Sequence, residues 1–194
     1  MKIYDVTQPI VLKRGVYDLN SDPNFNYQPN RVINWDGGRL EDVEKVSRGI
    51  RTSADWKREL IALGDAAMRE ERTDNAIAYY RMSEFFMYDG DPDKKKYYEL
   101  ATKQFYEYYA GYFEGDSPRI ERLSVPYAGV SLPVMHVVPD GASRGTLLLH
   151  GGNDSYFEEF LFSLLYLQEL GYEVYLFEGP GQGGVIRTQG MHFT

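Results

Sequence analysis

The chain has 194 residues, of which 43% are hydrophobic and 26% are charged, a balance typical of a globular protein. Its formal net charge of -8 argues against a nucleic acid or an anionic membrane as partner, because both are bound mainly through Lys and Arg. The chain contains no cysteine, which excludes disulfides, thiolate metal sites and cysteine nucleophiles from it.

The N-terminal stretch predicts no targeting or membrane-spanning segment. Asp5 and Gln8 interrupt it, so it lacks the apolar core of a signal peptide. No window of the sequence approaches the roughly 20 apolar residues that a membrane span requires. We therefore expect a cytoplasmic protein.

The first 50 residues carry weak signals of secondary structure. Residues 1–38 are rich in Asp, Asn, Pro and Gly, which favour turns, and we expect an irregular segment there. Residues 39–50 place Leu40, Val43 and Ile50 on roughly one side of a short helix.

Three further helices are predicted from their caps and from apolar residues at helical spacing. Ser53 is expected to cap the first helix, and Thr73 the second, which would run to Asp89-Gly90. Asp91-Pro92 combines a cap with proline at the first helical position, and this third helix should end at Gly115. The short links predict antiparallel neighbours, as a helical hairpin plus one helix.

Aromatic residues are concentrated in these helices. The chain has 17 Tyr and 10 Phe, and many of them lie between residues 79 and 113. Tyrosine has an apolar body and a polar tip, which suits both a helical core with wet edges and the wall of a cleft. Both interpretations stay open. The candidates for a shared core and substrate-binding wall are Phe85, Phe86, Tyr108 and Tyr112.

At Arg119 the apolar period changes from 3.6 to 2, which predicts strands. The alternation on both sides of Tyr127-Ala128-Gly129 indicates a β-hairpin. Pro133 has no backbone donor, so we expect its strand to lie at a sheet edge or to be bulged there.

Residues 146–177 predict a βαβ unit. The segments 146–150 and 172–177 are nearly continuous in apolar residues, as in parallel strands covered on both faces. Between them a helix is expected from Ser155, with Glu158 placed for a capping box. The crossover should be right-handed.

Leu148 and Leu176 lie in the middle of the two predicted parallel strands. Strands of this kind have helices on both faces of their sheet. We expect both leucines to be buried, in adjacent strands.

A glycine-rich loop, His150-Gly151-Gly152-Asn153-Asp154-Ser155, follows the first of these strands. At that edge of a parallel sheet, glycines let the backbone approach a ligand, and exposed N–H groups can hold an anion such as a developing oxyanion. The alternative is a tight turn in which glycine only relieves crowding.

A second loop follows the other strand and contains a literal G-x-G-x-x-G from Gly179 to Gly184. This spacing has the form of a dinucleotide fingerprint. Pro180 removes a donor from the stretch that would hold the phosphates, and no apolar helix pattern follows in residues 185–194. A nicotinamide-binding protein is therefore the least favoured hypothesis, and no cofactor is expected.

The stretches LLLHGGNDSYFEEF and GYEVYLFEGPGQG are similar to α/β-hydrolases of the group containing 2,6-dihydroxypseudooxynicotine hydrolase and the fermentation-respiration switch protein. The similarity extends back through the helices and the hairpin and covers about residues 40–190. It implies the N-terminal part of an α/β-hydrolase, a β-hairpin plus a βαβ unit preceded by a helical cap segment. The expected division is an irregular segment at 1–38, the cap at 39–117, and the first strands of the core at 118–194.

The resemblance also assigns roles to the loops. The backbone N–H of Asn153, helped by that of Gly152, would be an oxyanion-hole donor. Residues 178–183 would shape the site without taking part in the chemistry. His150 would orient the loop and not act as the general base, since the catalytic His of the family comes late in the chain.

The chain has no serine in a G-x-S-x-G context. In this fold the nucleophile, the acid and the His all follow the fourth strand. We therefore expect a chain truncated before the nucleophile elbow and inactive alone. It would need a complementary C-terminal segment, or it would form homo-oligomers through its unpaired edges.

The sequence favours a serine hydrolase that acts by acyl transfer on a small-molecule ester, amide or activated C–C bond next to a carbonyl. This chain would supply the oxyanion-hole loop and the cap, without a metal. The alternative is a non-catalytic helical interaction module fused to a degenerate hydrolase half.

Overall fold

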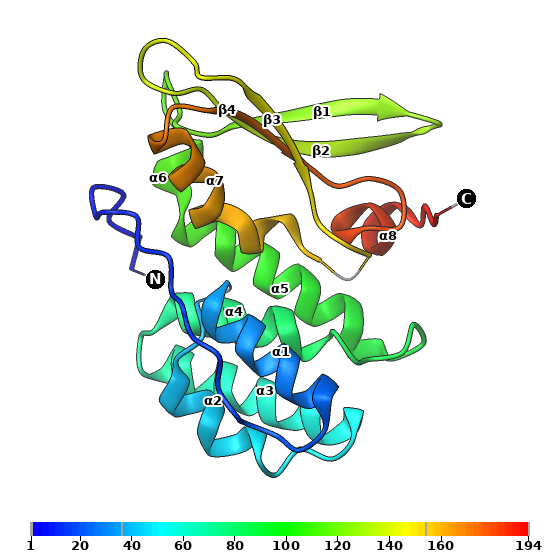
Figure 1. Cartoon of the computed structure of the whole chain (residues 1–194). Coiled ribbons are helices and arrows are strands. Elements are labelled where there is room, and N and C mark those ends of the chain that lie inside the picture. Colours follow the sequence, from blue (N-terminus) through cyan, green and yellow to red (C-terminus); the bar gives the residue numbers. More distant parts are fainter. Residues whose placement is uncertain (1, 36, 154, 194) are drawn as a thin grey trace. The chain divides into compact units, whose positions relative to one another are not determined.

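The computed structural model describes residues 2–35, 37–153 and 155–193. The chain forms two compact units, which we call the helical unit (Met1–Tyr4 with Leu12–Tyr108) and the sheet unit (Asp5–Val11 with Tyr109–Thr194). Figure 1 labels their elements.

The described residues of the helical unit form the helices α1 (Pro23–Asn34), α2 (Leu40–Ser47), α3 (Ser53–Arg69), α4 (Thr73–Ser83) and α5 (Pro92–Tyr108). Helix α2 confirms the short helix predicted within residues 39–50. Helix α1 lies in the segment that we expected to be irregular, so that prediction was wrong for residues 23–34. The Asp22 side chain accepts from the N–H groups of Asn24 and Phe25, and Pro23 occupies the first helical position. The Asp-Pro-Asn run that we took for a turn is the helix start.

Helices α3, α4 and α5 form the predicted hairpin plus one helix, because α4 packs against both neighbours. Gly64 lies inside α3 because a Cβ atom there would overlap the Tyr80 ring of α4. The Trp56 indole N–H donates to the Met82 carbonyl at 2.7 Å, which joins α3 to the end of α4. The close crossing is thus fixed by one glycine and one buried hydrogen bond.

The helix boundaries differ from the predicted ones by small, explicable amounts. Thr52 rather than Ser53 caps α3, in a reciprocal capping box with Asp55. The N-cap of α4 is Arg72, so Thr73 is its first helical residue, and α4 ends at Ser83, before the expected Asp89-Gly90 stop. Asp91 caps α5 as expected, accepting from the N–H of Asp93 at 2.9 Å.

The third predicted helix is interrupted near its end. Helix α5 stops at Tyr108, and a short α6 (Ala110–Phe113) follows in the sheet unit. Helix α5 belongs to the helical unit and α6 to the sheet unit, so the predicted stripe of aromatic residues is divided between the two units.

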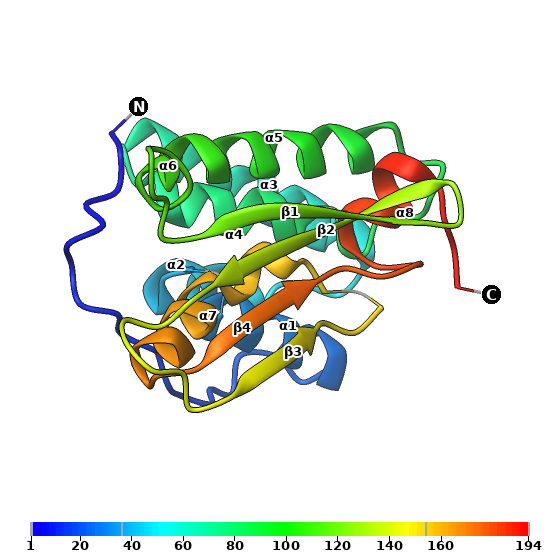
Figure 2. The ribbon, with the colours of Figure 1, turned by 90° about the horizontal axis from the view of Figure 1, so that it is seen from above.

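In the sheet unit, the residues that the structure describes form the strands β1 (Glu121–Tyr127), β2 (Val130–Val137), β3 (Thr146–His150) and β4 (Glu173–Phe177). Their order in the sheet is β1-β2-β4-β3, and Figure 2 shows them side by side in this order. β1 and β2 form the predicted hairpin. β3 and β4 are parallel and are joined through η1 (Phe157–Phe160) and α7 (Leu161–Glu169), which confirms the βαβ unit. A last helix, α8, spans Gly183–Gln189.

Pro133 does not lie at a sheet edge, because β2 pairs with β1 on one side and with β4 on the other. Pro133 faces Ser124 in the hairpin register, and the pairing with β4 begins one residue later, at Val134. On the β4 side Pro133 offers only its carbonyl, which accepts from the Glu178 N–H at 3.2 Å. The proline is tolerated because no donor is required of it there.

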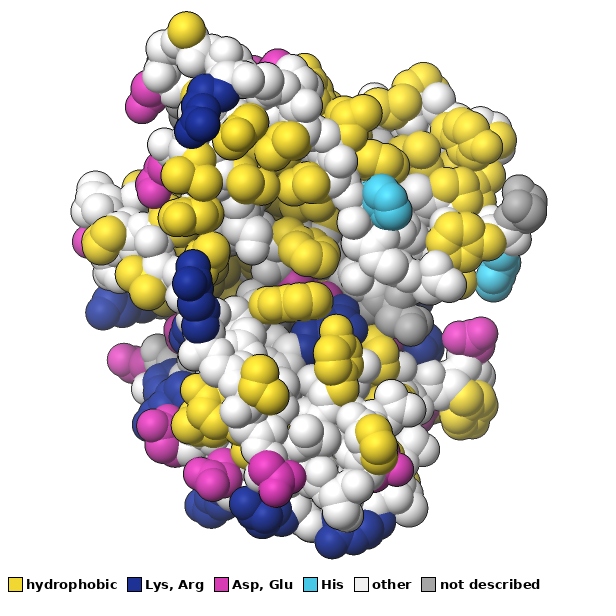
Figure 3. Space-filling model, viewed as in Figure 1, with side chains coloured by type: hydrophobic (Ala, Val, Ile, Leu, Met, Phe, Trp, Pro, Cys, Tyr) yellow, Lys and Arg dark blue, Asp and Glu magenta, His cyan; other side chains and the backbone are white. Residues whose placement is uncertain are grey.

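The two faces of the sheet differ in burial. Met135, Val137, Val174 and Leu176 are buried on the face that α7 covers. Figure 1 shows α7 and α8 on the same side of the sheet. On the opposite face, which we call the open face, Leu148 and the residues of β1 are exposed, although Val134 and His136 are buried. Figure 3 shows hydrophobic side chains at the surface in the upper part of the view, where the sheet unit lies.

Leu148 lies on the open face and is 72% exposed, so the prediction that it is buried was wrong. Leu176 is 1% exposed, as predicted. Within the part of the chain that the structure describes, β3 pairs with β4 alone, so β3 is an edge strand. The continuous apolar run of β3 indicates a strand suited to burial on both faces, but it does not show whether other elements cover both faces.

Among residues 2–35, 37–153 and 155–193, no helix combines the length and apolar character needed to cross a bilayer.

Candidate functional site

The two glycine-rich loops are adjacent because they follow neighbouring parallel strands. His150 at the end of β3 is in register with Phe177 at the end of β4. The loop of residues 151–155 and the loop of residues 178–182 therefore leave the sheet at the same, C-terminal edge. In open α/β sheets this edge is where ligands bind.

The first loop is a hydrogen-bonded turn. The Ser155 N–H donates to the Gly152 carbonyl at 3.3 Å, and the Gly152 N–H donates to the Ser155 hydroxyl at 3.0 Å. A Cβ atom on Gly151 would overlap the Ser155 side chain, so the turn requires glycine there. The glycines thus serve the turn and also let the backbone approach the edge of the sheet.

The two candidate oxyanion donors differ in whether their N–H already has an acceptor. The Gly152 N–H already has the Ser155 hydroxyl as its acceptor. The Asn153 N–H has no acceptor among the residues that the structure describes, and Asn153 is exposed. Of the two predicted donors, Asn153 is the one with its N–H available to a ligand.

His150 contacts the backbone of the first loop. Its Nδ1 lies 2.7 Å from the Gly151 carbonyl oxygen, and its ring is 5.7 Å from that of Phe177, centroid to centroid. This arrangement supports the predicted role of His150 in orienting the loop.

The helix after the first loop begins later than expected. It opens with the 3₁₀ turn η1, followed by α7, and the capping pair is Tyr156 with Glu159 instead of Ser155 with Glu158. The Tyr156 N–H donates to the Glu159 carboxylate at 2.9 Å. Ser155 is not free to cap this helix because its hydroxyl is used within the turn.

Glu178, the first residue of the second loop, holds the starts of the helices that follow the two loops. Its carboxyl accepts from the Phe157 N–H at 3.1 Å, beyond the first loop, and from the Gly184 N–H at 2.7 Å, in α8. Only 3% of Glu178 is exposed, and burial raises the pKa of its carboxyl to about 8. The Glu158 carboxyl adds to the rise, whereas the two N–H groups and Arg187 oppose it.

Gln182 connects the two loops directly. Its Oε1 accepts from the Gly179 N–H at 2.7 Å, and its Nε2 donates to the carbonyls of Gly151 and Gly152. Sequence reasoning placed residues 178–183 at the site but missed both bridging roles. One available signal was the acidic residue directly after a buried apolar strand, because a carboxyl there must find donors.

The G-x-G-x-x-G stretch is not arranged to hold a phosphate. The N–H groups of Gly179, Gly181 and Gly184 donate to Gln182, to the Met191 carbonyl and to Glu178. A dinucleotide would need such groups free. A helix does follow the motif, contrary to our expectation, but α8 is only seven residues long.

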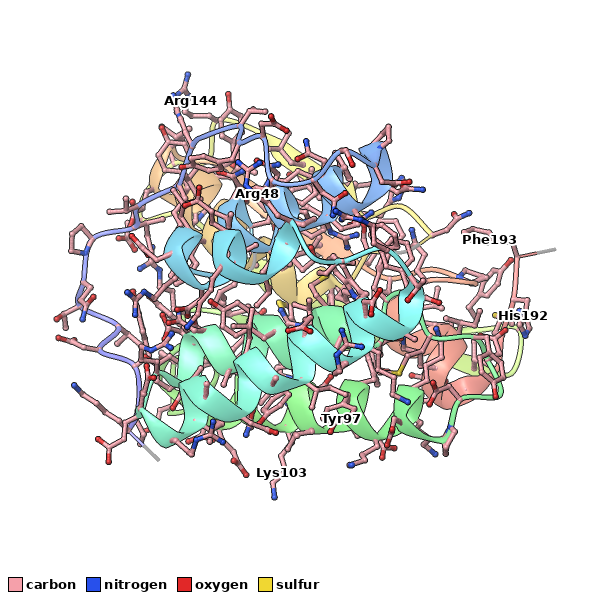
Figure 4. The ribbon with its side chains drawn as sticks, turned by 90° about the horizontal axis from the view of Figure 1, so that it is seen from below. Arg48, Tyr97, Lys103, Arg144, His192 and Phe193 are labelled. Carbon is pink, nitrogen blue, oxygen red and sulfur yellow. The ribbon has the colours of Figure 1, made fainter. Side chains whose placement is uncertain are left out.

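The other two histidines lie elsewhere. His136 stacks on Tyr175 and contacts the carboxylates of Glu121 and Glu173 at 2.8 and 3.0 Å. Glu173 begins β4, at the end of that strand opposite to the loops. His192 is exposed and lies beside Phe193 on the C-terminal tail, as Figure 4 shows. Within the described ranges, no group of three His, Asp or Glu residues is placed to bind a metal.

The four aromatic candidates lie in both units. Phe85 and Phe86 form an edge-on pair in the helical unit, and Phe86 also contacts Trp56. Tyr108 is half-buried against Tyr4, and burial raises the pKa of its hydroxyl to about 12. Tyr112 belongs to the sheet unit and is fully buried.

The raised pKa of Glu178 predicts that the chain loses stability as the pH rises. Between about 4.5 and about 8 the folded carboxyl holds a proton that the unfolded one has released. The free energy of unfolding should therefore fall through this window, by about 1.4 kcal/mol per pH unit. Urea unfolding of the 194-residue chain at several pH values measures this slope.

Glu178→Gln cannot ionise, so the slope should flatten in this variant, whatever its absolute stability. Glu114→Gln is the control, because Glu114 is exposed in the same unit and its variant should keep the wild-type slope. An equally steep slope in Glu178→Gln would contradict the assignment.

No family model matches the chain. It is 32% identical over 195 residues to the hydrolyase poxO of Penicillium oxalicum, across 87% of this chain and 45% of that protein. It is 44% identical over 73 residues to the alpha/beta hydrolase psoB of Aspergillus fumigatus, across 34% of this chain and 16% of that protein.

Among solved structures, the fold is similar to that of 2,6-dihydroxy-pseudo-oxynicotine hydrolase, with a TM-score of 0.51 and 21% identity, over 83% of this chain and 47% of that one. The chain thus spans less than half the length of the proteins that it matches. It is related to the α/β-hydrolases, and its fold is that of the N-terminal portion of one.

Proposed function

We propose that this chain is the N-terminal part of a serine hydrolase that acts by acyl transfer on an ester, an amide or an activated C–C bond next to a carbonyl. The observation that carries the proposal is the first glycine loop. It presents the Asn153 N–H, without an acceptor among the described residues, at the C-terminal edge of two parallel strands. An N–H in that position can bind the oxyanion of a tetrahedral intermediate.

The proposal assigns the attacking serine to a part of a longer protein outside residues 1–194. It rests on two observations: the absence of a G-x-S-x-G sequence from the chain, and its coverage of only 45% of its relative from Penicillium oxalicum. We refer to that longer protein as the full-length protein. Its remaining segment would complete the site, and a small acyl compound would be the substrate.

The aromatic residues of α5, α6 and the α4–α5 link are proposed to contribute to the wall of the acyl pocket. Tyrosine and phenylalanine supply apolar area with few rotatable bonds, which suits recognition of an acyl group. Tyr112 is buried within the sheet unit, so its side chain presents no surface to a ligand. The candidates for contact with a ligand are Phe85, Phe86 and Tyr108, which are each half-buried.

A fluorophosphonate probe tests the proposal directly, since it labels only a serine activated for nucleophilic attack. We expect stoichiometric labelling of one serine of the full-length protein, outside residues 1–194, together with hydrolysis of an activated ester. The 194-residue chain should show neither. Mass spectrometry of the labelled peptide locates the serine.

Two results would count against the proposal. Labelling of a serine within this chain, such as Ser155, would place catalysis here. A folded full-length protein without labelling or esterase activity would favour the non-catalytic helical module.

A further inference from the structure

The Gln182 side chain is held at both ends of its amide group. Its Oε1 accepts from the Gly179 N–H, in its own loop, at 2.7 Å. Its Nε2 donates to the Gly151 and Gly152 carbonyls of the other loop, to Gly152 at 3.3 Å. Because Gly179 occupies the oxygen, the NH₂ group must face the first loop.

Holding a carbonyl also sets the direction of the next N–H. A peptide unit is planar and trans, so its N–H points away from its C=O. The Gly152 carbonyl and the Asn153 N–H belong to one peptide unit. A donor that holds the Gly152 oxygen therefore turns the Asn153 N–H to the opposite side, away from Gln182.

From this geometry we propose that Gln182 is a positioning residue that fixes the direction of the Asn153 N–H. The inference rests on the proposed function, in which that N–H binds the oxyanion. Gln182 touches no reacting atom and acts only through the backbone of the first loop. The loop that carries Gln182 is itself held by the Glu178 carboxyl, which accepts from the N–H groups of Phe157 and Gly184.

A merely structural role would be to satisfy carbonyls that water cannot reach. The Gly152 carbonyl already accepts from the Ser155 N–H at 3.3 Å, so it does not need a side chain as its donor. Gln182, in contrast, is only 6% exposed. A buried side chain that donates to a carbonyl which already has a donor serves to orient that carbonyl.

Gln182→Glu tests the two ends of the Gln182 amide group separately. A carboxylate still accepts from the Gly179 N–H, but it has no hydrogen to donate to the Gly151 and Gly152 carbonyls. In the 194-residue chain, hydrogen exchange of the Gly152 amide should become about tenfold faster, because the loop loses the stabilisation of about one hydrogen bond. Exchange of the Gly179 amide should stay unchanged, because its acceptor is kept. Amide exchange followed by NMR resolves the two residues.

Gln189→Glu is the matched control. Gln189 is the last residue of α8, and its side-chain amide bonds to the backbone of Ser131 in the hairpin. Its Oε1 accepts from the Ser131 N–H at 2.8 Å, and its Nε2 donates to the Ser131 carbonyl at 2.7 Å. The same substitution there removes a comparable contact without touching the first loop, so exchange of Gly152 should not change. Gln182→Asn, whose amide is too short to reach, replaces Gln182→Glu if that variant fails to fold.

In the full-length protein, Gln182→Glu should lower kcat about tenfold and leave KM unchanged, because an oxyanion donor acts only in the transition state. Unchanged exchange of Gly152 would overturn the inference. Faster exchange with an unchanged kcat would also overturn it, since the loop would then be held for another reason. A full-length protein without activity refutes the proposed function instead, and the exchange result still decides whether Gln182 holds the loop.

Discussion

Asn153→Pro is expected to lower the turnover number of the full-length protein by about 10²–10³, the usual effect of losing one oxyanion-hole donor. Proline has no N–H, so the substitution removes the group proposed to bind the oxyanion. The turn itself should tolerate it. Asn153 is the second residue of the turn closed by the Gly152 carbonyl and the Ser155 N–H, a position that proline favours.

Asn153→Ala is the matched control, because alanine removes the side chain and keeps the backbone donor. It should retain most of the turnover. Steady-state kinetics on an activated ester, with folding checked by circular dichroism, compares the two variants. Equal activity of the proline and alanine variants would remove the Asn153 N–H from the mechanism.

Leu176→Ala is expected to cost about 2–5 kcal/mol of unfolding free energy in the 194-residue chain. Leu176 is 1% exposed in β4, in register with Met135 on one side and Leu149 on the other, so alanine leaves a cavity in the core of the sheet unit. Urea unfolding measures the loss.

Leu148→Ala makes the same chemical change in the neighbouring strand. Leu148 is 72% exposed on the open face, so alanine there should lower the free energy of unfolding by no more than about 0.5 kcal/mol. A loss of several kcal/mol at Leu148 would mean that this face is covered in solution, and equal losses at the two sites would contradict the two faces described for the sheet.

The sheet unit shows which parts of a site local sequence can reveal. The two glycine loops were found because each follows an apolar strand, and strand ends of a βαβ unit meet at one edge. The bridges between the loops were not found. Gln182 is 30 and 31 residues from the carbonyls that it holds, and Glu178 is 21 residues from Phe157. No spacing rule links residues that far apart.

The G-x-G-x-x-G motif shows the converse limit. Its spacing has the form of a dinucleotide fingerprint, but a fingerprint requires free N–H groups. Whether those groups are free depends on which side chains fold back onto them. Here Gln182 and Glu178 do so, from within the same loop.

By itself, the sequence determined the helices α2 to α5, the hairpin and the parallel pair, because capping, apolar period and turn chemistry act within a few residues. The relation to the α/β-hydrolases was indicated separately, by the resemblance of the two glycine loops and the strands before them. The sequence did not reveal helix α1, and it predicted that Leu148 is buried, whereas the side chain is exposed. Only the tertiary structure decided which face of the sheet is covered and which N–H of the first loop remains available. Burial and hydrogen bonding of that kind depend on the elements that become neighbours in space, and the sequence of one segment does not contain its neighbours.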